Sequence, residues 1–206
     1  MPMPHRQVKR RPRPRHWVAA LLALAAGLLA GQLLLHQFLL WRYPQKYSGL
    51  VQQYAAEYDL DPNILYAFIH TESGFDPLAE SEAGARGLTQ ITNETFEWIK
   101  LKCAPHEEIT FDDLYNPAVS IRFGAYFIAA SLDRYGGDLS TAAAAYHNGW
   151  GAVDSLLEQE EYSRDGSTLH TFPFSRMNRY VYKINHSYQR YQSLYPQGYY
   201  DTVRRS

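Results

Sequence analysis

One glutamate falls on an otherwise apolar helical stripe, an arrangement that suits acid catalysis. Leu65, Phe68 and Ile69 recur at helical spacing, and Glu72 continues their stripe at the end of the segment. A carboxyl group on such a face must be paired, hydrogen-bonded or protonated, because burying an ionised group is costly. Partial burial raises the pKa of a carboxyl group, which is the shift that a general acid needs near neutral pH. Position alone favours a glutamate that reaches solvent from the last helical turn, and the sequence around Glu72 is what supports the catalytic interpretation.

The elements that must position Glu72 are helices separated by glycine, proline and asparagine, and we expect a compact, mostly α domain. Asp61-Pro62 and Asn116-Pro117 each supply a capping side chain followed by a first-turn proline. Thr92 or Asn93 can open another helix, and Ser140 a short one. The expected helices cover about residues 48–58, 62–73, 93–103, 117–135 and 142–147, with a last one marked by Met177, Tyr180, Val181, Ile184, Tyr188 and Tyr191.

Three ordered blocks of sequence resemble family 1 of the soluble lytic transglycosylase (SLT) domain. The first block, residues 71–91, reads TESGFDPLAESEAGARGLTQI. The second begins with LYNP at residues 114–117 and continues with IRFGAYF at 121–127. The third, residues 144–153, reads AAYHNGWGAV. The resemblance covers about residues 48–193, and three blocks in the same order make it far more specific than a lone Glu-Ser pair.

The resemblance implies a goose-type-lysozyme-like fold and cleavage of the β-1,4 bond between N-acetylmuramic acid and N-acetylglucosamine. It implies a non-hydrolytic reaction, in which the muramyl 6-hydroxyl attacks the anomeric carbon and leaves a 1,6-anhydro end. Ordinary glycosidases need two carboxyl groups, but here Glu72 alone occupies a matched catalytic position. It would protonate the leaving oxygen and then accept the proton of the 6-hydroxyl. We interpret nearby Asp76, which precedes a proline, as a turn residue.

The same resemblance assigns substrate-binding roles to further residues around Glu72. They are Ser73, Ser81, Gln90, Tyr146, His147 and Tyr180, while Gly84 and Gly87 would form close turns. Three positions depart from the family pattern. His147 replaces an asparagine and adds a group that titrates near neutral pH. Thr89 replaces a methionine, which would remove an apolar wall beside the site. Arg176-Met177-Asn178 replaces Glu-Thr-Arg and removes an acid.

The N-terminal segment has the composition of a membrane anchor. Residues 1–16 contain six basic residues and no acid, and residues 17–40 contain no charged residue. We therefore expect a basic cytoplasmic tail (1–16) and a transmembrane signal-anchor helix (17–40). A linker (41–47) interrupted by Pro44, the SLT domain (48–196) and a C-terminal tail (197–206) follow. A signal peptide cleaved near Ala26, Ala30 or Gly31 is the alternative. In either case the domain lies outside the cytoplasmic membrane.

Charge and cysteine content narrow the function classes. The chain beyond residue 16 has 14 basic and 21 acidic residues, which argues against nucleic acid as a partner. One cysteine excludes an internal disulfide, and we expect no cofactor and no metal. The expected partners are peptidoglycan strands and the cell membrane. A lysozyme-like hydrolase and a catalytically weak peptidoglycan-binding component of an envelope assembly stay open as alternatives. The sequence does not distinguish general wall turnover from a role in secretion or conjugation.

Overall fold

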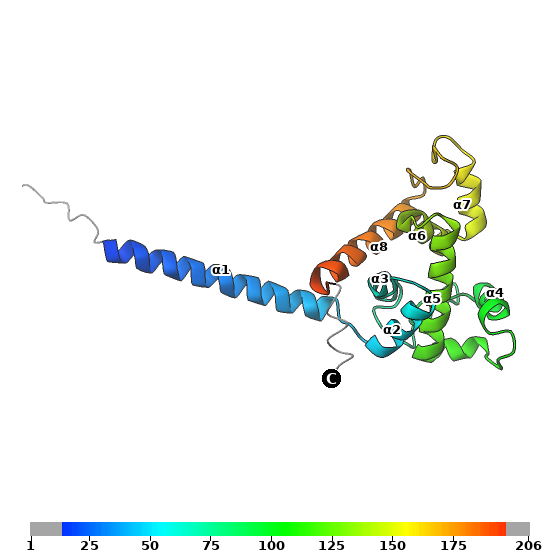
Figure 1. Ribbon diagram of the computed structural model, residues 1–206, viewed down its shortest axis with the longest axis horizontal. Helices are drawn as coiled ribbons and strands as arrows, with labels where there is room; N and C mark the ends of the chain where they lie inside the picture. Colours follow the sequence, from blue (N-terminus) through cyan, green and yellow to red (C-terminus); the bar gives the residue numbers. More distant parts are fainter. Residues whose placement is uncertain (1–13, 197–206) are drawn as a thin grey trace, which may run out of the picture. The chain divides into compact units, whose positions relative to one another are not determined.

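The computed structural model describes residues 14–196, which fall into two units divided after Arg42. The first unit contains α1 (Pro14–Arg42), and the second contains the remaining helices (Figure 1). The expected tails, residues 1–13 of the first and all of 197–206, lie outside the described residues. The helices of the second unit are α2 (Ser48–Glu57), α3 (Pro62–Glu72), α4 (Asn93–Cys103), the 3-10 helix η1 (Phe111–Tyr115), α5 (Pro117–Arg134), α6 (Leu139–Asn148), α7 (Trp150–Leu157) and α8 (Ser175–Leu194).

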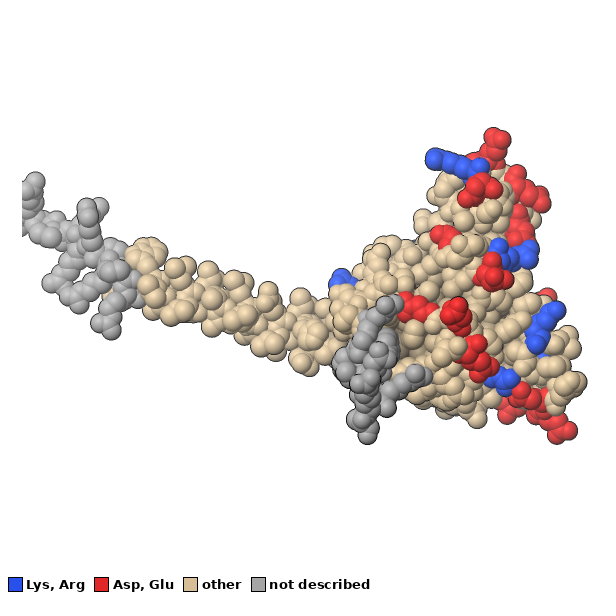
Figure 2. Space-filling model, in the orientation of Figure 1, with Lys and Arg blue, Asp and Glu red and all other residues tan. Residues whose placement is uncertain are grey.

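Helix α1 has the length and composition of a membrane-spanning helix. Its apolar span runs over 27 residues, His16–Arg42, and none of the 18-residue apolar stretch within it is buried. At 1.5 Å per residue this is about 40 Å, enough to cross a hydrocarbon layer of about 30 Å. In Figure 2 the surface of this helix from His16 on shows no charged side chain before Arg42, its last residue. A signal sequence would share these properties.

The segment between α1 and α2 is shorter than expected and belongs partly to the domain. Residues 41 and 42 continue α1, so only residues 43–47 lie between the two helices. Tyr43 is buried and its ring stacks on His70 at 4.8 Å between centroids. Its carbonyl oxygen accepts a hydrogen bond of 2.9 Å from Tyr195. Tyr43, inside the expected linker, is therefore fixed within the helical domain.

Helix α3 runs through the middle of the domain. The Asp61 carboxylate accepts a hydrogen bond from the Asn63 amide, and Pro62 follows, so the predicted cap is confirmed. Residues 65–69 are all buried, which means that the helix is surrounded on every side and has no single apolar stripe. It packs against α8, α2 and α5. Because α3 is enclosed, its last residue, Glu72, is held in a fixed place.

Helices α5, α6 and α8 complete the frame around α3. Asn116 caps α5 through the Ala118 amide, as predicted. Helix α6 packs against both α5 and α8. Its cap is Asp138, which accepts from the Thr141 amide at 2.7 Å, so the expected start at Ser140 is wrong by two residues. The buried side of α8 carries Met177, Tyr180, Val181, Ile184, Ser187 and Tyr191, which confirms the predicted last helix apart from half-buried Tyr188.

A second core lies between α4, η1 and α5. Ile91, Phe96, Ile99, Leu114 and Phe123 form its buried centre, with the rings of Phe96 and Phe123 stacked at 5.2 Å. Thr92 caps α4 by accepting from the Thr95 amide, which settles the choice between Thr92 and Asn93. Within residues 14–196 the only β structure is a pair of isolated bridges in the loop between α3 and α4. The mostly α prediction is confirmed.

Candidate active site

Glu72 is the last residue of α3, and its surroundings make it a weak acid. The helix ends there because Gly74 adopts a positive φ of 59°. The side chain is half-buried, and Tyr180 donates a hydrogen bond to its Oε1. Burial among protein atoms raises the pKa of Glu72 to about 7, while the Tyr180 hydrogen bond and the charge of Lys183 act in the opposite direction. Near neutral pH the carboxyl group is therefore divided between both protonation states.

Two tyrosines from other helices, the buried Tyr180 and the half-buried Tyr146, lie beside this carboxyl group. Tyr180 comes from α8, and Tyr146 comes from the last turn of α6. The Phe68 ring packs against both, at 4.9 Å from Tyr146 and 6.5 Å from Tyr180. Burial and the neighbouring Glu72 charge raise the pKa of both phenols, which keeps them neutral and able to donate. The Tyr146 hydroxyl donates to the Thr89 carbonyl oxygen at 2.7 Å.

His147 covers the outer side of Tyr180. The two rings stack with their centroids 4.5 Å apart and only 10° between their planes. Although much of His147 is exposed, partial burial and the nearby charge of Arg176 lower its pKa. The imidazole is consequently neutral at pH 7, and the histidine that replaces the family asparagine serves as a flat lid on the Tyr180 ring.

The loop between α3 and α4 holds three further predicted residues, and their polar groups fasten the loop itself. The Ser73 hydroxyl donates to the Leu88 carbonyl at 2.8 Å and accepts from the Phe75 amide at 3.2 Å. The Gln90 side-chain amide donates at 3.0 Å to two carbonyl oxygens of the loop. The Ser81 hydroxyl, on an exposed residue, accepts from the Ala85 amide. These side chains shape the loop that follows Glu72.

Turn residues in this loop behave as predicted. The Asp76 carboxylate accepts from the Leu78 amide at 2.9 Å, so it closes a local turn and makes no contact with Glu72. Gly84 and Gly87 have positive φ angles of 75° and 76°. At Gly87 a Cβ atom would come within 2.0 Å of the Leu114 carbonyl oxygen. This loop therefore closes onto η1 only because residue 87 has no side chain.

Thr89 does not line the site as expected from its place in the family pattern. Its side chain is fully buried and faces α5, where its hydroxyl donates to the Ser120 carbonyl oxygen at 2.9 Å. Gly124 of α5 leaves the space that the Thr89 methyl group fills. The exchange of methionine for threonine thus changes the packing of the loop on α5, and no apolar groove wall is lost.

Three cations lie beside the site, of which the sequence indicated only Arg176. Arg176, Arg179 and Lys183 lie with Tyr180 and His147 around a pocket of about 180 Å³. Their spacing of three and four residues places them on one face of α8 together with Tyr180. Helical periodicity around Tyr180 could have identified this face. The replacement of the family acid by Arg176 was noticed only as the loss of a negative charge.

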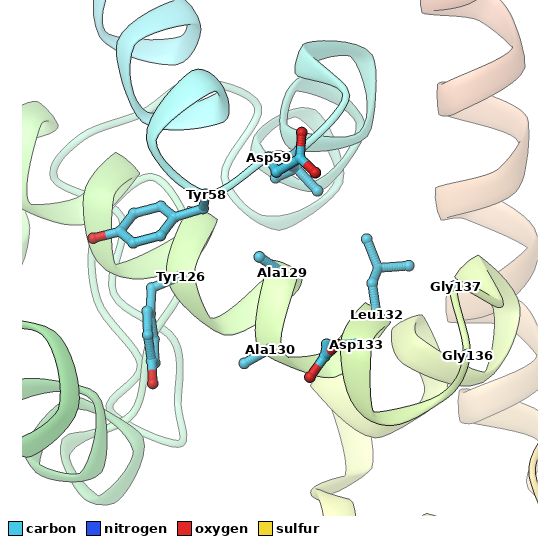
Figure 3. A pocket seen from close by; sticks show the side chains of 10 residues that line it. Tyr58, Asp59, Tyr126, Ala129, Ala130, Leu132, Asp133, Gly136 and Gly137 are labelled. Carbon is cyan, nitrogen blue, oxygen red and sulfur yellow. The ribbon is translucent and has the colours of Figure 1, made fainter.

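Two other pockets lie away from Glu72. One, of about 300 Å³, is lined by Trp98, Phe127 and Trp150 with residues of α4. Another, of about 520 Å³, lies between the end of α2 and α5, where Tyr58, Asp59, Tyr126 and Asp133 surround it (Figure 3). No predicted site residue lines either pocket, so Glu72 and its neighbours remain the candidate active site. Within residues 14–196 no group of three His, Cys, Asp or Glu side chains is placed to hold a metal ion.

Comparison with known proteins identifies relatives along most of the helical domain. A transglycosylase from Enterobacteria phage PRD1 is 36% identical over 103 residues, covering 48% of this chain and 35% of the phage protein. The membrane-bound lytic murein transglycosylase C of Glaesserella parasuis serovar 5 (strain SH0165) is 28% identical over 170 residues, covering 73% of this chain and 47% of that protein. The chain thus spans less than half the length of either relative.

Solved structures share the fold. The 70 kDa soluble lytic transglycosylase of Escherichia coli superposes with a TM-score of 0.70 at 23% identity, covering 77% of this chain and 26% of that one. An inactive glutamate-to-glutamine mutant of the lytic transglycosylase Slt of Pseudomonas aeruginosa gives 0.66 at 26% identity, covering 76% and 25%. The transglycosylase SLT domain model matches residues 49–168, more than half of the chain. The chain belongs to the transglycosylase SLT domain family.

Proposed function

We propose that this protein is a membrane-anchored peptidoglycan lytic transglycosylase that acts in cell-wall remodelling. It cleaves the β-1,4 bond between N-acetylmuramic acid and N-acetylglucosamine without water and leaves a 1,6-anhydro-muramyl end. The observation that carries the proposal is the half-buried Glu72 carboxyl group, with a pKa of about 7 and a hydrogen bond from Tyr180. Family membership and relatives named as transglycosylases support the same reaction.

Glu72 performs both proton transfers in this mechanism. Tyr180 donates to Oε1, so the acidic proton is available on Oε2 and passes to the glycosidic oxygen as the bond to the anomeric carbon breaks. The resulting carboxylate then accepts the proton of the muramyl 6-hydroxyl, whose oxygen forms the new bond to the same carbon. Glu72 ends protonated as it began. The Tyr180 hydrogen bond stabilises the carboxylate between the two steps.

The lack of a second acid near Glu72 supports intramolecular attack. A hydrolase of the two-carboxylate type places its second carboxyl group about 5–10 Å from the first. No other carboxyl group of the described residues contributes to the pKa of Glu72. The acids of the following loop have other partners, since Asp76 binds a backbone amide and Glu80 binds Tyr115 and Arg86. The substrate's own hydroxyl therefore supplies the nucleophile.

Membrane attachment through α1 is part of the proposal. Positive residues before the span favour a cytoplasmic N-terminus, which places the helical domain on the cell-wall side. The similarity to a protein named as membrane-bound supports this arrangement. A single-pass anchor keeps the domain within reach of glycan strands close to the membrane.

Clearing of a sacculus suspension tests whether the site is catalytic. We expect wild-type protein to lower the turbidity of purified sacculi and Glu72→Gln to be slower by a factor of about 10³ or more, because a glutamine can neither give nor take the proton. Glu158→Gln, at an exposed residue beyond α7, is the matched control and should act like wild type. Equal clearing by wild type and Glu72→Gln would contradict the catalytic role of Glu72, and no clearing by either would leave the peptidoglycan-binding alternative.

A further inference from the structure

The pocket on the outer side of the Glu72–Tyr180 pair carries an unbalanced positive charge. Arg176, Arg179 and Lys183 line it, and none of the three makes an ion pair or hydrogen bond with another described residue. Their charges act on groups of the site, since Lys183 lowers the pKa of Glu72 and Arg176 lowers that of His147. By contrast, Arg86, Arg122 and Arg134 of the same unit each form an ion pair with an acidic side chain.

Three neighbouring cations on one helix face weaken the fold when nothing neutralises them. Arg176 and Arg179 are three residues apart, and Arg179 and Lys183 are four apart, the spacings at which like charges on a helix repel. Acidic side chains predominate on the face of the domain in Figure 2, so the chain does not lack acids that could have been placed nearby. An uncompensated cluster beside a reactive carboxyl group suits an anionic part of a ligand.

We propose that this pocket binds a carboxylate carried by the muramyl residue at the cleavage site. The inference rests on the proposed function, because only that function places a muramyl sugar at Glu72. Every muramyl residue bears a lactyl group, which ends in a carboxylate when bare and continues into a stem peptide with free carboxylates when substituted. Tyr180 links the two places, since its hydroxyl contacts Glu72 and its ring lines the pocket.

The arginines are the residues suited to this recognition. A planar guanidinium binds a carboxylate through two parallel hydrogen bonds, whereas lysine offers a point charge. Arg176 and Arg179 are exposed at the start of α8 and are free to meet a ligand. The stacked rings of His147 and Tyr180 supply a flat wall against which a peptide or lactyl methyl group can lie. The pocket therefore distinguishes muramyl strands that carry a carboxylate from uncharged glycans.

The test compares substrates that differ only in charge. Glycan strands with stem peptides, and strands stripped of peptides by an amidase, are each used as they are and after carbodiimide coupling to methylamine, which turns carboxylates into neutral amides. Full-length protein in detergent is assayed by mass spectrometry of the released ends. We expect wild type to cleave the charged strands about tenfold faster than the amidated ones, and Arg176→Gln/Arg179→Gln to lose that preference.

Arg190→Gln, an exposed change on the same helix, is the matched control and should keep the preference. Thermal unfolding of the double variant should occur at the same temperature as wild type or higher, because repulsion is relieved. A preference in stem-bearing strands alone assigns the carboxylate to the peptide, and a preference in stripped strands alone assigns it to the lactyl group. A preference in both shows that the pocket accepts either carboxylate. Equal rates on charged and amidated strands, or an unchanged preference in the double variant, would overturn the inference.

Binding separates this inference from the proposed function. In the Glu72→Gln background, co-sedimentation with charged and amidated sacculi reports the pocket without turnover. We expect weaker binding to amidated sacculi, and loss of that difference when both arginines are replaced. A charge-dependent binding difference together with no cleavage by wild type would contradict the proposed function alone, whereas cleavage without any charge dependence would contradict the pocket alone.

Discussion

At the residue scale, the protonation of Glu72 links activity to pH. The first step needs the protonated carboxyl group, and its pKa of about 7 means that this form is lost as the pH rises through neutrality. We expect the rate of anhydro-end formation to fall above pH 7 by a factor approaching ten per pH unit. Initial rates on sacculi between pH 5 and 9 measure this alkaline fall in rate. A rate that stays constant from pH 6 to 9 would contradict the role of Glu72 as the acid.

The hydrogen bond from Tyr180 sets the pH at which the rate begins to fall on the alkaline side. Its donation favours the carboxylate and lowers the pKa of Glu72, so Tyr180→Phe should raise that pKa and move the alkaline limb to higher pH. We expect the maximal rate to fall by about tenfold, because the carboxylate loses one charge-assisted hydrogen bond. Tyr182→Phe, an exposed neighbour on α8, is the control and should leave both quantities unchanged. An unshifted limb in Tyr180→Phe would contradict the assignment.

The same carboxyl group should affect stability. Its pKa is raised in the folded state above the ordinary value of 4.5, so its favourable contribution is complete below pH 4.5 and is lost as the pH rises through about 7. Glu72→Gln should therefore raise the free energy of unfolding at pH 8 by about 2 kcal/mol and have little effect at pH 4.5. Urea unfolding of the detergent-solubilised protein at both pH values measures it. A stabilisation that is equal at both would show that titration is not its cause.

At the scale of elements, the loop between α3 and α4 depends on one glycine more than on another. Gly84 and Gly87 both have positive φ, but a Cβ atom meets nothing within 4 Å at Gly84 and lies 2.0 Å from the Leu114 carbonyl oxygen at Gly87. Gly84→Ala should cost about 1 kcal/mol of stability from backbone strain alone. Gly87→Ala should cost about 3 kcal/mol or more and slow catalysis, because the loop must move away from η1. Similar losses in both variants, measured by urea unfolding, would contradict this.

Element boundaries were predictable where a capping side chain is followed by proline, whereas the Asp138 cap of α6 was missed. Asp61 and Asn116 cap α3 and α5 as predicted, because an acceptor followed by proline fixes the first turn locally. Helix α7 was missed because it begins directly after Gly149 without a side-chain cap. The inward side chain of Thr89 and the enclosure of α3 depend on α5 and α8, which are distant in sequence. Local patterns cannot report such contacts.

The candidate site, too, combines features that the local sequence predicts with contacts that only the fold reveals. Helical position indicated Glu72 as a partly buried acid, and the resemblance gathered Tyr146, His147 and Tyr180 as candidates. The contact between Tyr180 and Glu72 joins residues 108 positions apart, so only the fold reveals it. Ser73 and Gln90 were predicted to bind substrate, and that role stays a prediction, since their polar groups brace the loop.

At the scale of the whole molecule, the two units imply a division between attachment and catalysis. We expect the protein to remain in the membrane fraction after alkaline carbonate extraction, because α1 is long enough to span the bilayer. Replacing Leu29 by lysine, near the middle of the span, should cost about 3 kcal/mol of insertion and release part of the protein. Intact mass of the membrane-bound form distinguishes a retained anchor from a cleaved signal peptide. Mature protein beginning near Gly31 would contradict the anchor.

The central claim concerns the fate of the glycosidic bond, and mass spectrometry of the fragments released from sacculi in H₂¹⁸O tests it most directly. The account predicts 1,6-anhydro-muramyl ends without ¹⁸O from wild type and none from Glu72→Gln. It depends on one acid, Glu72, and on the muramyl hydroxyl as nucleophile. Reducing muramic acid ends carrying ¹⁸O would contradict it and identify a hydrolase.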